Sequence, residues 1–210
     1  MPEALIWGAS GGIGRALVTR LKEKGWRVFA VARNSNNIPD VADMRVEFNA
    51  HDRNSIDNAA LAVAQESDGI DLVVYAAGGL EADRLHQLAQ EAWSQVIDSN
   101  LTGAFFITAP SLNLMKEEGH MIFFGAYGDH LILPKMGAYA VAKAGLEPFV
   151  KILAKENRKN RFTLIRPGAV DTPFWEKAPF KLPTNAKTPD EVVTSLLKHH
   201  EEGGSGELDL

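Results

Sequence analysis

The sequence contains no cysteine, and this absence excludes disulfide bonds, thiolate nucleophiles and thiolate metal sites. Its six histidines are scattered, apart from His199 and His200. That pair lies in a charged stretch near the C-terminal end of the sequence, and we expect both side chains to be solvated. We therefore expect no metal site.

Long hydrophobic runs are also absent, and the N-terminal segment has no basic flank, so the sequence predicts neither a signal peptide nor a membrane span. We expect a cytoplasmic protein. An excess of positive charge is lacking too, because the formal net charge is −5 and the basic residues are spread along the chain. These properties disfavour binding to nucleic acid or to membrane surfaces.

What the sequence does contain is a regular alternation of short apolar runs with longer helix-like segments. A chain of 210 residues with 45% hydrophobic content can bury the core of one α/β domain. The alternation predicts a single domain over 1–210, with a doubly wound, Rossmann-like parallel sheet of seven strands and helices on both faces. The strands are expected at 4–7, 27–32, 44–48, 71–76, 120–124, 161–166 and 207–210.

Helices are expected between these strands, at 12–24 and near 54–66, 91–117, 137–158 and 189–199. Gly25 is expected to end the first helix in a left-handed conformation. Pro110 and Pro148 interrupt two helical patterns, so we expect a local kink or break at each.

A glycine-rich turn joins the first strand to the first helix, which is the context of a dinucleotide-binding loop. Three glycines have distinct expected roles: Gly8 permits a tight turn, Gly12 a close approach to a pyrophosphate, and Gly14 close packing of the helix on the sheet. Free N–H groups at the helix start would face the phosphates. The alternative is a glycine-rich turn that binds no ligand. The expected contact residues of this loop are Gly8, Ser10, Gly11, Gly12, Ile13 and Gly14.

The spacing of these glycines resembles the short-chain dehydrogenase/reductase family, and the resemblance extends in order over essentially the whole chain. It implies binding of a nicotinamide dinucleotide. The family usually has threonine before the first glycine, where this chain has Trp7, which we expect to pack in the core.

The end of the second strand bears on the choice of nicotinamide cofactor. An acidic residue there would accept hydrogen bonds from the ribose hydroxyls of NAD, but this chain has Arg33, Asn34 and Ser35. An arginine fork with polar neighbours suits a phosphate dianion, so the sequence favours NADP(H) over NAD(H). Arg33 could instead be a solvated loop residue, or could stack on the adenine without discriminating.

Two further segments resemble cofactor-contacting segments of the family but depart from them. Asn49 stands where the family has an aspartate that contacts the adenine amine, and its amide oxygen could accept the same hydrogen bond. Tyr75 and Ala76 replace the two asparagines of another family signature. Ala76, Ala77 and Gly78 are still small enough for the cofactor to lie close.

Tyr139 and Lys143 are four residues apart in a predicted helix, so the phenol and the ammonium share one face. A nearby cation favours the phenolate, and we expect Lys143, helped by the oxidised nicotinamide, to lower the pKa of Tyr139 toward the working pH. Tyr139 could then exchange a proton with a carbonyl or alcohol oxygen. The resemblance also implies that Lys143 binds the nicotinamide ribose. The segment after the sixth strand resembles another cofactor-contacting stretch, in which Thr172 would hold the carboxamide, with contacts from Pro167, Gly168 and Val170.

The catalytic set of the family is incomplete in this chain. Asn100 matches the asparagine that kinks the fourth helix and holds a water of the proton relay, although a helix-surface amide is the alternative. The catalytic serine is replaced by Ala126, and no Ser or Thr occurs from Phe123 to His130. We hypothesise that the hydroxyl of Tyr127 substitutes for it. A tyrosine packed beside the substrate cleft is an equal alternative.

These features predict a reductase of a carbonyl, or a dehydrogenase of the matching alcohol. A non-catalytic NADP(H) sensor is the alternative suggested by Ala126, and an interaction scaffold ranks last because it would not need the glycine loop. An apolar lid is expected at about 173–188, which suits a small or flat hydrophobic carbonyl. Family members commonly form dimers or tetramers through the fourth and fifth helices, and an apolar helix around 101–115 suits such a homo-oligomer.

Overall fold

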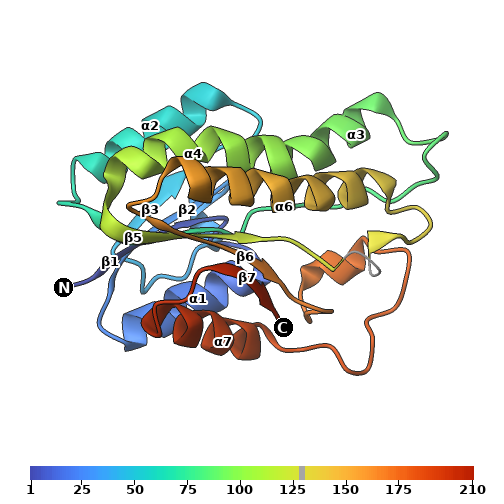
Figure 1. The fold of residues 1–210 in the computed structure, drawn as a ribbon. Coiled ribbons are helices and arrows are strands. Elements are labelled where there is room, and N and C mark those ends of the chain that lie inside the picture. The colour runs from blue at the N-terminus through green and yellow to red at the C-terminus, as the bar shows by residue number, and fades with distance from the viewer. Residues whose placement is uncertain (128–130) are drawn as a thin grey trace.

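The sheet has seven strands in the order β3-β2-β1-β4-β5-β6-β7, and all neighbouring strands are parallel (Figure 1). This arrangement comes from a computed structural model, which describes residues 1–127 and 131–210. The doubly wound parallel sheet of seven strands expected from the sequence is confirmed. The strands are β1 (Glu3–Trp7), β2 (Arg27–Ala32), β3 (Met44–Glu47), β4 (Ile70–Tyr75), β5 (Met115–Phe124), β6 (Arg161–Arg166) and β7 (Gly206–Asp209).

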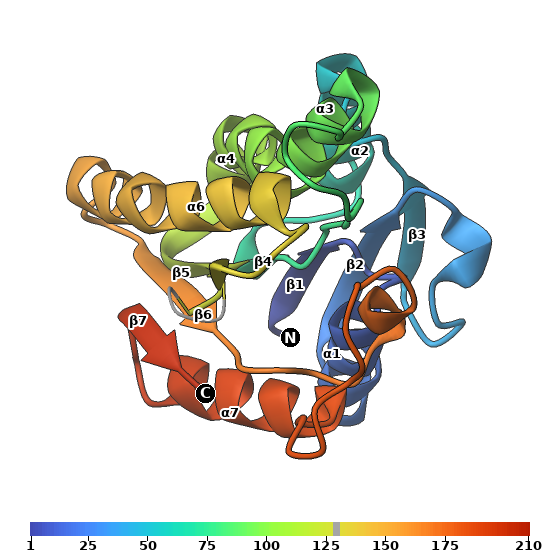
Figure 2. The ribbon, with the colours of Figure 1, turned by 90° about the vertical axis from the view of Figure 1, so that its right-hand side faces the viewer.

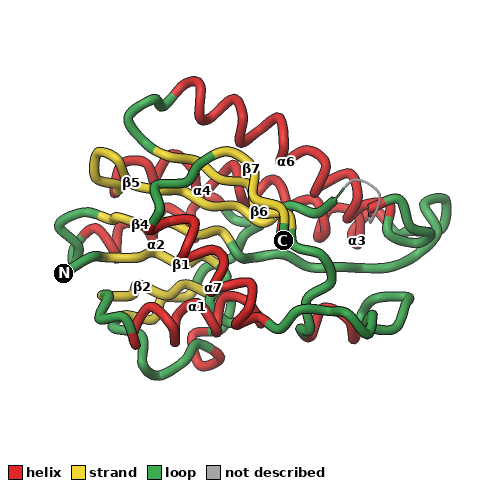
Figure 3. Tube along the Cα trace, turned by 60° about the horizontal axis from the view of Figure 1, so that its bottom comes forward, coloured by secondary structure: helices red, strands yellow, loops and turns green. Residues whose placement is uncertain are grey.

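Helices cover both faces of the sheet. Four of them, α2, α3, α4 and α6, lie on one face, and α1 and α7 lie side by side on the other (Figures 1 and 3). Each face has its own apolar core. The helices are α1 (Gly12–Glu23), α2 (Arg53–Ala64), α3 (Gln90–Ile97), α4 (Gly103–Leu114), α6 (Gly137–Glu156) and α7 (Pro189–Glu201), with short helical turns at η1 (Ser35–Asn37), η2 (Asp98–Thr102) and η3 (Pro173–Glu176).

Burial follows the alternation of side chains along each strand. In β2, Val28 and Ala30 face the core under α1 and α7, whereas Phe29 and Val31 face the core under α2 and α4. Trp7 is fully buried and donates its indole N–H to Ser111 Oγ at 3.1 Å, so its expected packing role is confirmed. β2 and β3 lie on one side of β1 and β4 lies on the other, so the strand order reverses between β1 and β4, and a crevice is expected at the carboxyl ends of these two strands.

The expected helix over 91–117 is wrong at its C-terminal end and is not continuous. It consists of α3, the π-helical turn η2 and α4, and strand β5 already begins at Met115. Met115 pairs with Ile70 of β4, and the pairing becomes irregular before Leu72 meets His120. Glu118 adopts a φ of 64° there, and its N–H donates to the carbonyl of Lys159. Backbone pairing with β4 thus explains why β5 includes the polar residues that follow Met115.

The breaks considered at the two prolines do not occur. Pro110 lies inside α4 and Pro148 inside α6, and both helices continue through them. Proline removes one intrahelical N–H donor, and the packing of both helices against the sheet outweighs this local loss.

The expectation that His199 and His200 are solvated is also wrong. Both are half-buried at the end of α7, where they meet the fully buried His120 of β5. His120 Nδ1 lies 3.1 Å from His200 Nδ1, and His120 Nε2 lies 2.8 Å from the hydroxyl of Thr163. His199 Nε2 lies 3.2 Å from the same hydroxyl. The three rings therefore form one cluster between α7 and the sheet.

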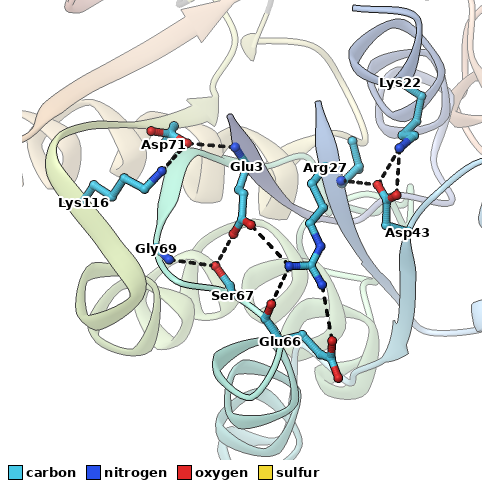
Figure 4. Close-up of polar contacts among 10 residues, drawn as sticks. Glu3, Lys22, Arg27, Asp43, Glu66, Ser67, Gly69, Asp71 and Lys116 are labelled. Carbon is cyan, nitrogen blue, oxygen red and sulfur yellow. Dashed lines mark hydrogen bonds and ion pairs between the residues drawn. The ribbon is translucent and has the colours of Figure 1, made fainter. Parts of the chain in front are cut away.

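A network of polar contacts joins the strands at their amino ends (Figure 4). The carboxylate of Glu3 accepts hydrogen bonds from Arg27 and Ser67, and its backbone N–H donates to Asp71 at 2.8 Å. Lys116 also pairs with Asp71, at 2.8 Å. These contacts tie β1, β2, β4 and β5 together at the edge opposite the glycine turn. Within the described parts of the chain, no helix is both long and apolar enough to cross a bilayer.

Candidate active site

The turn after β1 brings the backbone of the glycine loop against the segment after β4. Gly8 has a φ of +93° and donates its N–H to the carbonyl of Val31 at 2.8 Å. A Cβ at Gly8 would lie 2.3 Å from the backbone nitrogen of Ala77, and one at Gly14 would lie 2.2 Å from the carbonyl oxygen of Gly8. Only glycine fits this close approach, which matches the tight turn and the close helix packing expected for Gly8 and Gly14.

The start of α1 is arranged to receive an anion. Gly11 is the N-cap residue, no side chain among the described residues caps the helix, and its first turn contains no acidic residue. Ser10 and Ile13 are half-buried beside it. The unpaired N–H groups of a helix start attract negative charge, so this cradle fits the pyrophosphate of a dinucleotide.

Gly12 has a second neighbour that the sequence did not indicate. A Cβ at Gly12 would lie 2.5 Å from Cγ2 of Thr172, at the start of the segment after β6. The glycine loop and the Thr172 segment, far apart in the sequence, therefore meet at one place. The absence of a side chain at Gly12 therefore allows Thr172 to approach the glycine loop closely, in addition to the close approach expected for a pyrophosphate.

The end of β2 differs from the sequence expectation because a carboxylate, that of Glu47, lies beside it. Arg33 is exposed and, among the described residues, its side chain forms no ion pair or hydrogen bond. Asn34 accepts a hydrogen bond from the N–H of Asn36 at 2.9 Å. Both the N–H and the hydroxyl of Ser35 donate to Oε1 of Glu47, each at 3.1 Å. A carboxylate from β3 therefore lies beside the three residues assigned to the phosphate.

Asn49 and Tyr75 each have a partner within the protein. Oδ1 of Asn49 accepts the N–H of His51 at 3.1 Å, which leaves one lone pair for another donor. Tyr75 is buried, and its hydroxyl donates to the carbonyl of Ser99 at 2.8 Å. Tyr75 thus packs between β4 and the η2 turn, while the half-buried Ala76 and Ala77 continue past the glycine loop.

Tyr139 and Lys143 lie on the same face of α6 at the carboxyl edge of the sheet. Nζ of Lys143 is 5.6 Å from the centroid of the Tyr139 ring, and it donates to the carbonyl of Phe124, the last residue of β5, at 2.7 Å. Lys143 is buried, and this burial lowers its pKa to about 8. The ammonium is therefore still the main form at neutral pH.

In the protein alone the pKa of Tyr139 is raised, whereas the expectation from the sequence also included the charge of the oxidised nicotinamide. Burial raises this pKa above its ordinary value, and among the protein's own groups the Lys143 cation does not reverse this. Tyr139 is therefore a neutral phenol at neutral pH. Such a group is ready to donate a proton rather than to accept one.

Asn100 lies in the π-helical turn η2, and its side chain lies close to Gly78, near Lys143. Its side-chain N–H groups donate to the carbonyls of Gly79 and Val96, both at 2.8 Å. Its Oδ1 is buried and has no hydrogen-bond partner in residues 1–127 or 131–210. A Cβ at Gly78 would lie 2.7 Å from this oxygen and 3.8 Å from Nζ of Lys143. Asn100 is thus a buried amide near Lys143, and its expected position on a distorted helix is what the structure has.

The region of the missing serine is described only in part. Ala126 and Tyr127 are half-buried, and the ring of Tyr127 lies 5.9 Å from the guanidinium carbon of Arg166. Of the segment in which the sequence has no Ser or Thr, residues 128–130 lie outside the described residues.

The segment expected to be the lid, 173–188, forms a loop with a closed base. Val170 forms a parallel bridge with Lys187 at that base. The ring of Phe174 packs on the ring of Tyr139, with 5.2 Å between their centroids, and the indole of Trp175 donates to the carbonyl of Val170 at 2.8 Å. Figure 2 shows this orange segment at the carboxyl edge of the sheet.

Two contacts of this edge were not foreseen from the sequence. Lys177 of the lid forms an ion pair with Glu81 of the segment after β4. Gly168, after β6, donates its N–H to the carbonyl of Leu210 at 3.0 Å, and Pro167 beside it is half-buried. Single charged residues in loops carry no pattern that predicts such partners. Among the described residues, no group of histidine and acidic side chains could hold a metal ion.

A parallel sheet whose strand order reverses beside a helix start suited to phosphate is the architecture of dinucleotide-binding α/β proteins. Residues 2–181 match the family model described as short chain dehydrogenase. The chain therefore belongs to the short-chain dehydrogenase/reductase family. Its membership makes it an NAD(P)-dependent oxidoreductase acting on CH–OH or C=O groups.

Individual relatives agree with this assignment. A 3-oxoacyl-[acyl-carrier-protein] reductase from Vibrio cholerae is 30% identical over 179 residues, which cover 80% of this chain and 73% of that protein. An uncharacterized oxidoreductase from Staphylococcus aureus is 27% identical over 180 residues, covering 80% of this chain and 78% of that protein. The crystal structure of an alcohol dehydrogenase from the archaeon Thermococcus sibiricus, complexed with 5-hydroxy-NADP, superposes with a TM-score of 0.90 at 27% identity and covers 100% of this chain and 96% of that chain.

Proposed function

We propose that the protein reduces a carbonyl with NADPH, or oxidises the matching alcohol with NADP, and that Tyr139 is its general acid and base. The observation that carries this proposal is the pairing of Tyr139 with the buried Lys143 at the sheet edge that also holds the glycine cradle. A neutral phenol beside a buried ammonium is a proton donor whose charged product is stabilised.

The bound nicotinamide would supply the hydride that forms the new C–H bond. Tyr139 gives its hydroxyl proton to the carbonyl oxygen, which becomes the alcohol, and the tyrosine is left as a phenolate. Lys143 stabilises that phenolate through its positive charge, because its Nζ lies 5.6 Å from the centroid of the Tyr139 ring. The proton is then restored from solvent. In the alcohol-oxidising direction the phenolate accepts the proton, which at neutral pH requires more positive charge near Tyr139 than the protein's own groups provide.

Other residues position the reactants. The buried Oδ1 of Asn100 needs a donor, and a water bound there would link Lys143 to solvent as a proton relay. Thr172 would hold the carboxamide and Asn49 the adenine amine, as the resemblance to the family implies. The loop from Gly8 to Gly14 would bind the pyrophosphate.

The preference for NADP(H) is supported by Arg33, an exposed cation without a side-chain partner in the described parts of the chain. It also agrees with the dehydrogenase of Thermococcus sibiricus, which was crystallised with 5-hydroxy-NADP. Titration of the purified protein with NADPH and NADH tests it, and tighter binding of NADPH is expected. Equal or weaker binding of NADPH would remove the preference.

The hydroxyl that polarises the substrate is proposed to come from Tyr127, because Ala126 stands at the position of the family's serine. Loss of such a donor costs about 10²–10³ in turnover. We expect Tyr127→Phe to reduce kcat by that order, and an unchanged kcat would end the substitution hypothesis. Ala126 also favours a second function, a non-catalytic sensor of NADP(H), which would bind the cofactor tightly and turn over no carbonyl.

The segment 173–188 is proposed as the substrate lid of the single domain, and a small or flat hydrophobic carbonyl is the substrate class that suits it. The Phe174 ring against Tyr139 supports this, because a flat apolar substrate could take the same place. The cytoplasmic location expected from the sequence stays a prediction.

A homodimer or homotetramer is proposed to form through α4 and α6. Each of these helices exposes large apolar side chains, namely Phe105 on α4 at 57% exposure, and Val141 and Ile152 on α6 at 52% and 53%. Exposed apolar residues on neighbouring helices are a common basis of protein interfaces.

A further inference from the structure

Next to Arg33, Asn34 and Ser35, the residues proposed to bind the 2′-phosphate, lies the carboxylate of Glu47, which is distant from them in the sequence. Ala32, the last residue of β2, is the register partner of Glu47, the last residue of β3. This pairing places Glu47 next to the segment of Arg33, Asn34 and Ser35. Fifteen positions of sequence separate Ala32 from Glu47, and only the sheet register brings them together.

Glu47 takes both hydrogen-bond donors of Ser35. The N–H and the hydroxyl of Ser35 both donate to Oε1 of Glu47, at 3.1 Å each. The other end of the same turn is fixed by Arg15, which donates to the carbonyl of Asn37 at 2.5 Å. The η1 turn is therefore held in a conformation in which Ser35 faces a carboxylate.

This arrangement bears on the adenosine ribose of the cofactor. A 2′-phosphate that accepts a hydrogen bond from Ser35 would share that donor with Glu47, and two anions on one donor repel each other. A free 2′-hydroxyl is different, because it can itself donate to the carboxylate. Arg33 favours the phosphate, and Glu47 opposes it.

We propose that Glu47 is a specificity-determining residue, which weakens binding of the 2′-phosphorylated dinucleotide relative to the dinucleotide with a free 2′-hydroxyl. The proposal rests on the proposed dinucleotide-binding function. The balance between Arg33 and Glu47 then sets how far the protein prefers NADP(H).

The test is the Glu47→Gln variant, titrated separately with NADPH and NADH. Glutamine keeps an oxygen that accepts from Ser35, so the η1 turn is retained while the negative charge is removed. Glu47 is an exposed side chain, which makes the exchange compatible with folding. We expect the Kd for NADPH to fall about tenfold relative to the Kd for NADH, equivalent to about 1.4 kcal/mol. Glu47→Ala should shift the ratio in the same direction.

Glu117→Gln is the matched control, because Glu117 is also exposed and its removal changes the net charge equally. It lies on β5 and pairs with Lys159 at 2.6 Å, and it should leave the ratio of the two Kd values unchanged. A ratio in Glu47→Gln within twofold of the wild-type ratio overturns this inference alone. Failure of the wild-type protein to bind either dinucleotide overturns both the inference and the proposed function.

Discussion

At the scale of single residues, the functional edge of the protein depends on burial. Burial lowers the pKa of Lys143 to about 8 and raises the pKa of Tyr139, so both groups are moved toward their neutral forms. Their closeness has a different effect, because Lys143 stabilises whatever negative charge Tyr139 acquires during proton transfer. The pair therefore favours donation of a proton from Tyr139 to a substrate oxygen.

The pKa of Lys143 predicts a pH limit to carbonyl reduction. The ammonium that stabilises the Tyr139 phenolate is present below about pH 8 and is lost as the pH rises through that value. We expect kcat for reduction to fall above pH 8. Lys143→Arg keeps its charge at every accessible pH, so any residual activity of this variant should lack the decline. A decline with the same midpoint in Lys143→Arg would show that another group causes it.

The sequence predicted those residues whose spacing is local. Tyr139 and Lys143 are one helical turn apart, so their shared face follows from helix geometry, and Gly8 and Gly14 belong to one turn. Glu47 beside Ser35 and His120 beside His200 could not be predicted, because they depend on strand register and on the docking of α7. The raised pKa of Tyr139 depends on burial, which the pattern of residues does not measure.

At the scale of secondary-structure elements, strand and helix types were predictable where hydrophobic periodicity is strong, and β2 and β6 have the predicted bounds. The predicted bounds are wrong where contacts with other elements of the fold, rather than local sequence, determine the secondary structure. Met115 enters β5 because β4 offers a backbone to pair with, and Pro110 stays helical because α4 packs on the sheet. Gly25 ends α1 at a φ of +77°, as its place after the helix predicted.

The turn between β1 and α1 should tolerate no side chain at Gly8. Gly8→Ala would place its Cβ 2.3 Å from the backbone of Ala77 at a positive φ, so we expect a stability loss of about 2–4 kcal/mol from strain and clash. Gly25→Ala is the control, since it also has a positive φ but nothing within 4 Å of the added Cβ. It should cost about 1 kcal/mol. Urea unfolding measures both, and equal losses would contradict a special close approach at Gly8.

The cluster of His120, His199 and His200 should make the packing of α7 sensitive to acid. Burial and the charge of Arg161 lower the pKa of His120 to about 2 and that of His200 to about 4, while Glu201 and Asp71 oppose the shift at His200. Burial lowers the pKa of His199 as well. Since the unfolded chain takes up these protons near pH 6.5, the contribution of each neutral histidine to stability is fully present above that pH. It is lost as the pH falls from about 6.5 to about 4 for His200, and to about 2 for His120.

The expected loss from pH 7.5 to pH 5 is about 2 kcal/mol for each strongly shifted histidine. This loss of stability should appear as a fall in the Tm of the wild type between pH 7.5 and pH 5. The fall should be smaller in His120→Gln, and also in His200→Gln, which replaces a less buried side chain. His51→Gln is the control, because His51 lies outside the cluster, 3.2 Å from Asp98. If His120→Gln and His200→Gln keep the wild-type pH dependence of Tm, the cluster is not its cause.

At the scale of the whole molecule, the two edges of the sheet have different tasks. The amino edge holds the ion pairs around Glu3 and Arg27, which join four strands (Figure 4). The carboxyl edge holds the glycine turn, Tyr139 and the segment 173–188. The doubly wound sheet of seven parallel strands could be predicted because short apolar runs recur along the chain with helix-like segments between most of them. The position of the lid against Tyr139 could not, since it depends on the contact with Phe174.

The apolar faces of α4 and α6 predict self-association. We expect Phe105→Asp to shift the protein to a smaller oligomer, because it puts a charge in the centre of the proposed interface. Val41→Asp is the control, since Val41 is 51% exposed but lies after the η1 turn, away from both helices. Light scattering after size-exclusion chromatography measures both. A wild-type monomer, or an unchanged oligomer in Phe105→Asp, would contradict the interface.

The central claim is that Tyr139 transfers a proton in an NADPH-dependent reduction. Its most direct test is a panel of carbonyl compounds, followed by cofactor absorbance, with wild-type protein and Tyr139→Phe that both bind NADPH. The account predicts turnover by the wild type and a loss of about 10²–10⁴ in kcat in Tyr139→Phe, with little change in the Kd for NADPH. Turnover that survives in Tyr139→Phe, or tight NADPH binding with no turnover of any carbonyl by the wild type, would contradict it.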